Sequence, residues 1–102
     1  GGRVMTIPHR VAILGHILKE HQSVSTQSQQ QRLSLALTYL GNITTIEARD
    51  YLDIMHPSGR IKELKEQGWL IISSRVRHIA PCGASHFIAN YVLQTLPLAR
   101  AA

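Results

Sequence analysis

The chain has 102 residues, a formal net charge of +5 and a sequence pI near 10.0. This length suits one small domain with a single core, and 44% hydrophobic and 17% charged residues are typical of a globular protein. No apolar run is long enough for a membrane span, and we find no pattern of a secretory leader. The single cysteine excludes an intrachain disulfide, so we expect a cytoplasmic protein. The basic charge favours a polyanionic partner.

Apolar residues at helical spacing predict a helix between residues 3 and 21. One stripe consists of Val11, Leu14 and Leu18. The apolar surface is widened by Ile13 and Ile17. Two interpretations stay open. The helix either thickens the core or meets a second copy of the chain, since symmetric dimers are the commonest assembly.

A polar, Gln-rich connector over residues 22–31 leads into a second predicted helix. Thr26 and Gln29 match a capping box at its start, and Gly41 marks its end. Its inward stripe consists of Leu33, Ala36, Leu37 and Leu40. Leu35 and Tyr39 lie off this stripe, and we expect them to contact the N-terminal helix.

Two short helices joined by a tight turn are predicted between Thr44 and Gly68. Thr44 and Glu47 form a capping box at the first helix, in which Ala48 and Leu52 share a face. The turn comprises Asp53, Ile54 and Met55. Pro57 suits the first position of the second helix, Gly68 suits its C-terminal cap, and its inward residues are Ile61 and Leu64. The arrangement is that of a helix-turn-helix.

Extended structure follows Gly68. Strands are predicted at residues 69–72 and 86–93, where apolar and β-branched residues are frequent. Between them lies the segment 75–85, with Pro81 and Gly83 as turn formers, which we predict to be a basic, partly ordered loop at the tip of a hairpin. A helix-turn-helix followed by such a hairpin is the winged form of the motif.

Residues 41–71, GNITTIEARDYLDIMHPSGRIKELKEQGWLI, and the later HFIANYVL resemble the small winged helix-turn-helix DNA-binding domains common in phage and prophage proteins. The resemblance runs from about Thr26 to Leu93. It implies a mostly α fold with a small β-hairpin (α+β), a winged helix-turn-helix with an extra N-terminal helix. Capping by Thr44 and Glu47 and a place for Arg60 in the recognition helix are also implied. The core residues that it implies are Ala48, Ile54, Ile61, Leu64 and Tyr91.

We therefore expect residues 1–24 to form an N-terminal helical extension, residues 25–95 the winged domain and residues 96–102 a fraying tail. The expected function is binding of double-stranded DNA, as a transcriptional regulator of a phage or other mobile element. Helix 57–67 would enter the major groove while the hairpin grips the backbone. The predicted DNA-binding residues are Thr44, Thr45, His56, Ser58, Gly59, Arg60, Lys62, Lys65, Arg75, Arg77 and His78.

Two other functions are compatible with the same sequence. The same fold would serve as a protein-interaction module that presents Asp50, Asp53, Glu63 and Glu66, or as a DNA-bending factor in recombination or replication. We expect no enzyme, because Cys82 with His78 and His86 lacks an orienting acid. No cofactor or small-molecule ligand is expected, and the six histidines show no metal-ligand spacing, so no metal is expected. The target sequence, the sign of regulation and the oligomeric state stay open.

Overall fold

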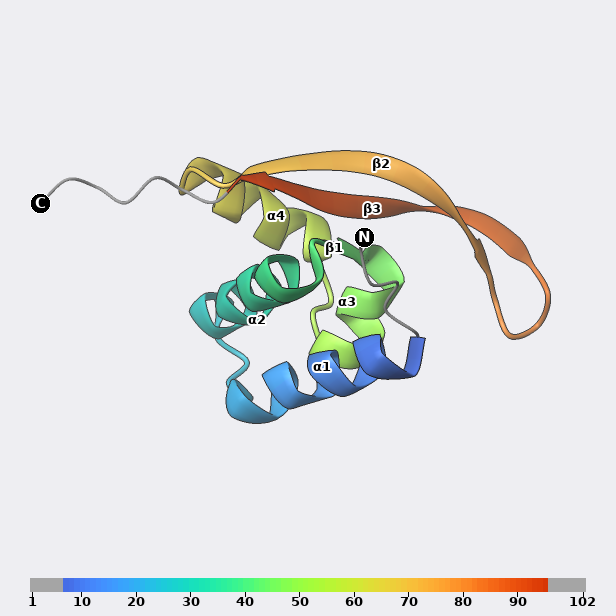
Figure 1. Ribbon diagram of the computed structural model, residues 1–102, viewed down its shortest axis with the longest axis horizontal. Coiled ribbons are helices and arrows are strands. Elements are labelled where there is room, and N and C mark those ends of the chain that lie inside the picture. The colour runs from blue at the N-terminus through green and yellow to red at the C-terminus, as the bar shows by residue number, and fades with distance from the viewer. Residues whose placement is uncertain (1–6, 96–102) are drawn as a thin grey trace, which may run out of the picture.

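The computed structural model describes residues 7–95, and within this range the chain forms four α-helices and three β-strands (Figure 1). In chain order they are α1 (Ile7–Glu20), α2 (Thr26–Leu40), β1 (Asn42–Thr44), α3 (Thr45–Leu52), α4 (Pro57–Glu66), β2 (Leu70–Ile79) and β3 (Ser85–Thr95). The strands form one sheet in the order β1-β3-β2, and both pairings are antiparallel. The helices lie below the long β2–β3 hairpin, whose tip extends beyond α3 (Figure 1).

The helix-turn-helix has the predicted boundaries. The hydroxyl of Thr44 accepts from the Glu47 amide at 3.1 Å, and the Glu47 carboxylate accepts from the Thr44 amide at 3.0 Å, so the predicted capping box is confirmed. Pro57 opens α4 as predicted. The helix ends at Glu66, slightly before Gly68, whose φ of 102° lies in the left-handed region that glycine adopts without strain.

The start of α2 differs from the prediction. Ser25 is the N-cap, and its hydroxyl accepts from the Ser28 amide at 3.1 Å. The predicted capping box of Thr26 and Gln29 is therefore wrong, because Thr26 is already helical and the Gln29 side chain donates to the carbonyl of Val24 at 2.8 Å. Serine and threonine both cap helices through their hydroxyls, so the sequence alone does not decide between the adjacent residues Ser25 and Thr26. The predicted end at Gly41 is confirmed, with a φ of 81°.

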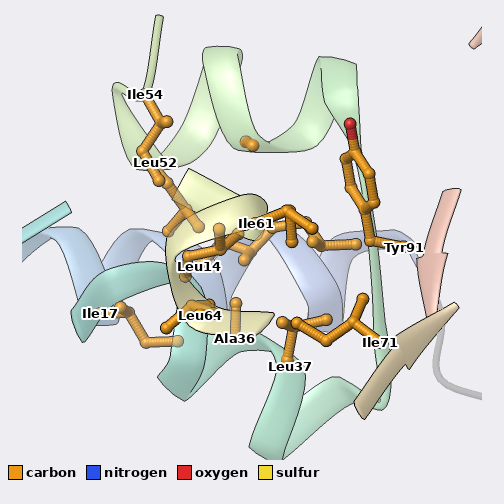
Figure 2. Close-up of a cluster of buried hydrophobic side chains, with 13 residues drawn as sticks. Leu14, Ile17, Ala36, Leu37, Leu52, Ile54, Ile61, Leu64, Ile71 and Tyr91 are labelled. Atoms are coloured by element: carbon orange, nitrogen blue, oxygen red, sulfur yellow. The ribbon is translucent and has the colours of Figure 1, made fainter. Parts of the chain in front are cut away.

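One apolar core joins all four helices to the sheet (Figure 2). Its buried members are Leu14, Ile17, Leu33, Ala36, Leu37, Ile43, Ala48, Leu52, Ile54, Ile61, Leu64, Ile71 and Tyr91. The core residues implied for the helix-turn-helix and β3 are thus buried. They fix the orientation of α4, since Ile61 and Leu64 hold one side of it against the rest of the protein.

The inward face of α1 is rotated from the predicted one. Ile17, which was expected to widen the apolar arc, is buried with Leu14, whereas Val11 and Leu18 are only half-buried. The reason is that α1 packs against both α2 and α3, so its deepest residues lie between these two neighbours. Since α1 shares the core, residues 7–20 are integral to the fold; the predicted division at residues 24 and 25 stays a prediction. Residues 3–6 of the predicted helix and the predicted tail, 96–102, lie outside the described range.

Strand β1 was not predicted. Its three residues are placed opposite β3, with Ile43 facing Tyr91 in the core and Thr44 facing Asn90. A strand this short carries almost no periodic signal, and it exists here because β3 supplies its hydrogen-bonding partner.

The hairpin is longer than predicted. Residues 75–79 belong to β2 and pair with β3 as far as Ser85, so only residues 80–84 form the connecting turn. The prediction of a loop over residues 75–85 is therefore wrong for most of its length. Regular pairing satisfies the backbone groups of both strands, whereas a loop of that length would leave them to solvent.

A buried arginine braces the connection between α1 and α2. Arg32 is 1% exposed, and its Nε donates to the carbonyl of Leu52 at 2.8 Å. Its Nη1 donates to the carbonyls of His21 and Ser23. Burial lowers the pKa of Arg32, and the nearby Asp53 carboxylate opposes that effect. This guanidinium therefore ties the end of α3 to the connector.

No helix in residues 7–95 is long and apolar enough to cross a bilayer.

Candidate nucleic-acid interface

The outward side of α4 is polar and basic. Pro57, Ile61 and Leu64 are buried, while the residues on the outer surface of the helix are exposed, namely Ser58, Lys62, Lys65 and Glu66. His56 precedes the helix, is exposed and makes no side-chain capping hydrogen bond. The structure thus brings four predicted site residues, His56, Ser58, Lys62 and Lys65, onto one short exposed segment.

Gly59 lies in the same first turn of α4 and is half-buried. A Cβ placed there would have no neighbouring atom within 4 Å. Packing inside the protein therefore does not require glycine at this position. A side chain at position 59 would instead affect how closely a binding partner can approach α4.

Arg60 lies on the flank of α4 that faces α2. Its Nε is 2.7 Å from Oε1 of Glu63, and its Nη1 donates to the hydroxyl of Thr26 at 3.2 Å. Glu63 also accepts from the side chain of Gln30 at 3.1 Å. The Arg60 side chain is only 20% exposed, so Arg60 is part of the α2–α4 contact and is less available to a ligand than the two lysines.

The hairpin presents two further cations. Arg75 and Arg77 are exposed on β2, directly opposite Ala89 and Phe87 of β3. The Nε of Arg77 donates to the hydroxyl of Ser85 at 2.8 Å, which holds its side chain along the hairpin. Residues 69–95 contain no Asp or Glu, so the hairpin is purely basic.

His78 is placed differently from the two arginines. It is half-buried on the opposite face of β2 and lines a groove of ≈ 450 Å³ between the hairpin, α1 and α3. Tyr51 and Asp50 of α3 are on the other wall of this groove. The structure does not group His78 with the exposed arginines.

Thr44 and Thr45 lie at the junction of β1 and α3. The Thr44 hydroxyl is occupied by the capping box, and the Thr45 hydroxyl donates to the carbonyl of Ala89 at 3.4 Å. Both residues are half-buried. Their hydroxyls are therefore engaged within the protein, and the structure does not bring them onto the exposed side of α4.

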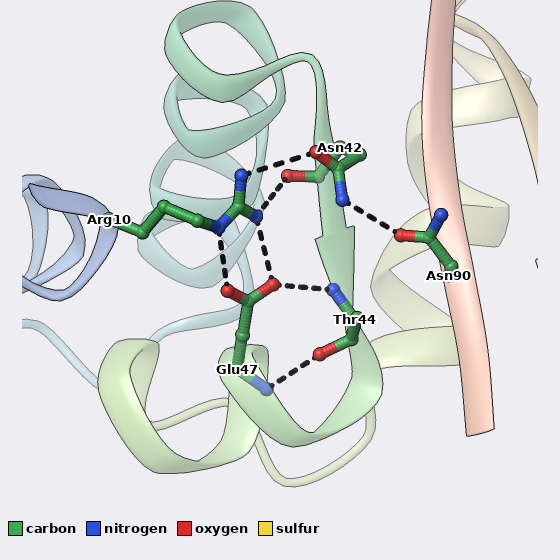
Figure 3. A network of polar contacts seen from close by, with 5 residues as sticks. All are labelled: Arg10, Asn42, Thr44, Glu47 and Asn90. Carbon is green, nitrogen blue, oxygen red and sulfur yellow. Dashed lines mark hydrogen bonds and ion pairs between the residues drawn. The ribbon is translucent and has the colours of Figure 1, made fainter. Parts of the chain in front are cut away.

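An ion pair that was not predicted from the sequence supports this junction (Figure 3). The Nε of Arg10 in α1 is 2.9 Å from Oε2 of Glu47, and its Nη2 donates to Oε1 at 3.0 Å. Arg10 also donates to the side chain and the carbonyl of Asn42, and Asn42 donates to Asn90 at 2.9 Å. One network therefore links α1, β1, α3 and β3. No sequence signal identifies Arg10, because its partners are distant in the chain.

The environment of Glu47 changes its pKa. Burial alone raises the pKa, but the bonds from Arg10 and from the amide of Thr44 outweigh burial, and the pKa lies below its ordinary value. Glu47 is therefore a carboxylate at neutral pH, as both the ion pair and the capping box require.

The described residues offer no cluster of three or more His, Cys, Asp or Glu side chains that would hold a metal ion. Cys82 is exposed in the turn of the hairpin. The expectations that the protein is not an enzyme and holds no cofactor stay predictions.

Comparison with known proteins agrees with this geometry. Residues 28–95 match a family model described as a winged helix-turn-helix domain. The match begins within α2 and ends with β3, so it covers the helix-turn-helix, the sheet and the hairpin. No curated protein and no solved structure shows a significant match.

Proposed function

Because the chain belongs to the winged helix-turn-helix domain family, we propose that it binds double-stranded DNA with the outward side of α4 in the major groove. The observation that carries the proposal is the polarity of this helix. Ile61 and Leu64 fix one side in the core, which leaves Lys62 and Lys65 directed to solvent on a rigid element. A major groove admits one α-helix, and lysines on it reach phosphates and base edges.

Within this mode of binding, the exposed residues differ in role. Ser58 and His56 lie at the start of α4, where a recognition helix contacts bases. Lys65 lies in the last turn and suits a phosphate contact. Arg75 and Arg77 suit the backbone beside the groove, because each phosphate that is neutralised releases counterions and stabilises the complex.

Arg60 contributes by a different route. A contact with DNA requires the guanidinium to leave Glu63 or to use the nitrogens that Glu63 does not occupy. We propose Arg60 as a secondary contact, with the exposed lysines as the primary ones. The predicted DNA contacts of Thr44 and Thr45 stay predictions, because the hydroxyl and the amide of Thr44 are both engaged with Glu47 and the hydroxyl of Thr45 is engaged with the carbonyl of Ala89.

The finer role follows from the same proposal. We propose a sequence-specific transcriptional regulator; its expected origin in a phage or mobile element stays a prediction. A homodimer through α1 also stays a prediction. Of the two residues expected to face a second copy, Ile13 and Ile17, the latter is buried in the protein's own core. Light scattering that gives a mass of twice 11.4 kDa would support the dimer.

The protein-interaction alternative is weakened by one observation. Of the acids that it uses, Glu63 is bound to Arg60 and Gln30, so only Asp50, Asp53 and Glu66 are exposed. These exposed acids lie on two different helices, α3 with its C-cap and α4.

Selection from a random duplex pool at near-physiological salt tests the proposal. The expected result is an enriched motif, and a palindromic motif would add support for a dimer. A matched selection uses Lys62→Ala combined with Lys65→Ala, which should retain little DNA and enrich no motif. Failure of the wild-type protein to retain any duplex above background would refute DNA binding and turn attention to a protein partner.

A further inference from the structure

The hairpin carries an exposed aromatic side chain that the proposed function leaves unexplained. Phe87 is the only phenylalanine in the chain and is 66% exposed. The sequence places it on one face of β3 with Tyr91, which is buried in the core. One exposed apolar side chain is common on protein surfaces, so the residues that surround Phe87 decide its significance.

The twist of the hairpin explains why Phe87 faces solvent. Residues directly opposite on antiparallel strands share a face, and so do alternate residues along one strand. Ile71, Tyr91, Arg77 and Phe87 therefore belong to the same side of the ribbon. Ile71 and Tyr91 are buried at the base, whereas Arg77 and Phe87 are exposed near the tip. Two-stranded ribbons twist strongly, and the ribbon in Figure 1 turns over toward its tip. The face that packs on the core at one end is therefore open at the other.

The exposed face near the tip is both apolar and positively charged. Arg77 is directly opposite Phe87, and Arg75 is opposite the small Ala89 on the same side. Ile79, 57% exposed, follows toward the turn and also lines the groove that contains His78. The hairpin has no acid to neutralise the two arginines. The Phe87 ring thus has two cations on the neighbouring strand, Arg77 directly across and Arg75 diagonally across.

This combination fits nucleic acid better than a protein surface. The arginines favour phosphates, while the aromatic ring beside them finds an apolar partner in the faces of stacked bases. Apolar side chains on DNA-binding elements are known to wedge between base steps in the minor groove, where flanking arginines also bind. Charge and apolarity therefore point to the same ligand.

We propose that Phe87 inserts between adjacent base pairs in the minor groove of duplex DNA, with Arg75 and Arg77 on the flanking phosphates. The inference rests on the proposed function, because it assigns the hairpin a contact beside the one made by α4. Insertion unstacks a base step and unwinds the duplex locally.

Two measurements on the full chain test this. Fluorescence anisotropy with a labelled 30-base-pair mixed-sequence duplex gives the affinity, and relaxation of a closed circular plasmid by topoisomerase I in the presence of protein gives the unwinding. Phe87→Ala should weaken binding by about tenfold, since an aromatic side chain stacked on a base contributes on this order. It should also abolish the shift in topoisomers. Phe87→Trp should keep both properties.

Ile72→Ala is the matched control. Ile72 is 50% exposed on the same hairpin but on the opposite face, away from the arginines, so its substitution should leave affinity and unwinding unchanged. Circular dichroism should show the same melting for all three variants, because neither residue is buried.

The outcomes separate the two proposals. Duplex binding without unwinding, or with equal affinity for Phe87→Ala, overturns the insertion and leaves the role of α4 intact. If Ile72→Ala and Phe87→Ala lose affinity and unwinding to the same extent, the insertion of Phe87 is overturned as well. No binding of the wild-type protein to duplex DNA overturns the proposed function itself.

Discussion

Arg10 and Glu47 are 37 residues apart in the chain and form a two-point ion pair, Nε to Oε2 at 2.9 Å and Nη2 to Oε1 at 3.0 Å. The same carboxylate caps α3 through the amide of Thr44. Glu47 therefore does two things at once: it starts the first helix of the helix-turn-helix and fixes that helix to α1.

Removal of the arginine should destabilise the fold. Arg10→Ala deletes charge-assisted hydrogen bonds at a site where both side chains are mostly buried, 17% and 20% exposed, and should lower the free energy of unfolding by about 1.5 to 3 kcal/mol. Urea denaturation measures the change. Arg49→Ala is the control, because Arg49 is exposed and its Nε makes a single bond of 3.3 Å to the carbonyl of Met55. Equal stability of Arg10→Ala and wild type would contradict the structural role of the pair.

The contribution of Glu47 to the stability of the fold should depend on pH. Its pKa is lowered in the folded protein, so the unfolded chain binds the proton more tightly. The stabilisation is complete above the unfolded pKa, about 4.3, and is lost as the pH falls through the lower, folded pKa. Glu47→Gln retains a residue that completes a capping box but removes the charge. The unfolding free energies of the wild type and Glu47→Gln should therefore differ at pH 7 and converge in acid. A constant difference down to pH 2 would contradict the role of the Glu47 charge.

The lysines of α4 should dominate the salt dependence of DNA binding. Lys62→Ala and Lys65→Ala should each reduce the slope of log K against log salt by about 0.9 if each lysine neutralises one phosphate. Lys19→Ala provides the comparison, since Lys19 is also an exposed lysine but lies in the last turn of α1. Anisotropy titrations across a range of salt concentrations give the slopes. A larger effect at Lys19 than at either lysine of α4 would place the interface elsewhere.

Substitutions at Arg60 and Glu63 distinguish a DNA contact by Arg60 from a structural role in joining α4 to α2. If Arg60 contacts a base, Arg60→Ala should weaken specific binding by about 1 to 3 kcal/mol and relax the preference at one position of the motif. Glu63→Gln should then maintain or strengthen binding, because it releases the guanidinium from its ion pair. If Arg60 only joins α4 to α2, Arg60→Ala should reduce stability in urea while the affinity of the folded protein stays unchanged.

Local signals explain what was predictable. Capping by Thr44 and Glu47, the stop at Gly41 and the start at Pro57 depend on neighbouring residues, and the structure has all three. The inward position of Ile61 and Leu64 follows from helical periodicity alone. These features define the helix-turn-helix, which is why the family and the fold class follow from sequence.

Tertiary contacts explain what was not predictable. Strand β1 exists because β3 lies beside it, and the length of β2 is set by its pairing with β3, not by its own composition. The roles of Arg10 and Arg32 depend on partners that are distant in the chain, such as Glu47 for Arg10 and Leu52 for Arg32. The exposure of Phe87 depends on the twist of the hairpin, which a pattern of alternating residues does not encode.

Strand β3 is supported on both sides along only part of its length. Residues 90–92 pair with β1 and with β2, whereas residues 85–89 pair with β2 alone. An isolated two-stranded ribbon is marginally stable in water, so amide hydrogen exchange should be slow at Tyr91 and increasingly fast toward Ser85. Asn90, which accepts a hydrogen bond from Asn42, lies where the doubly paired part of β3 ends. We therefore expect the base of the hairpin to stay fixed with the core, and its outer part to change its angle to the core without displacing α4.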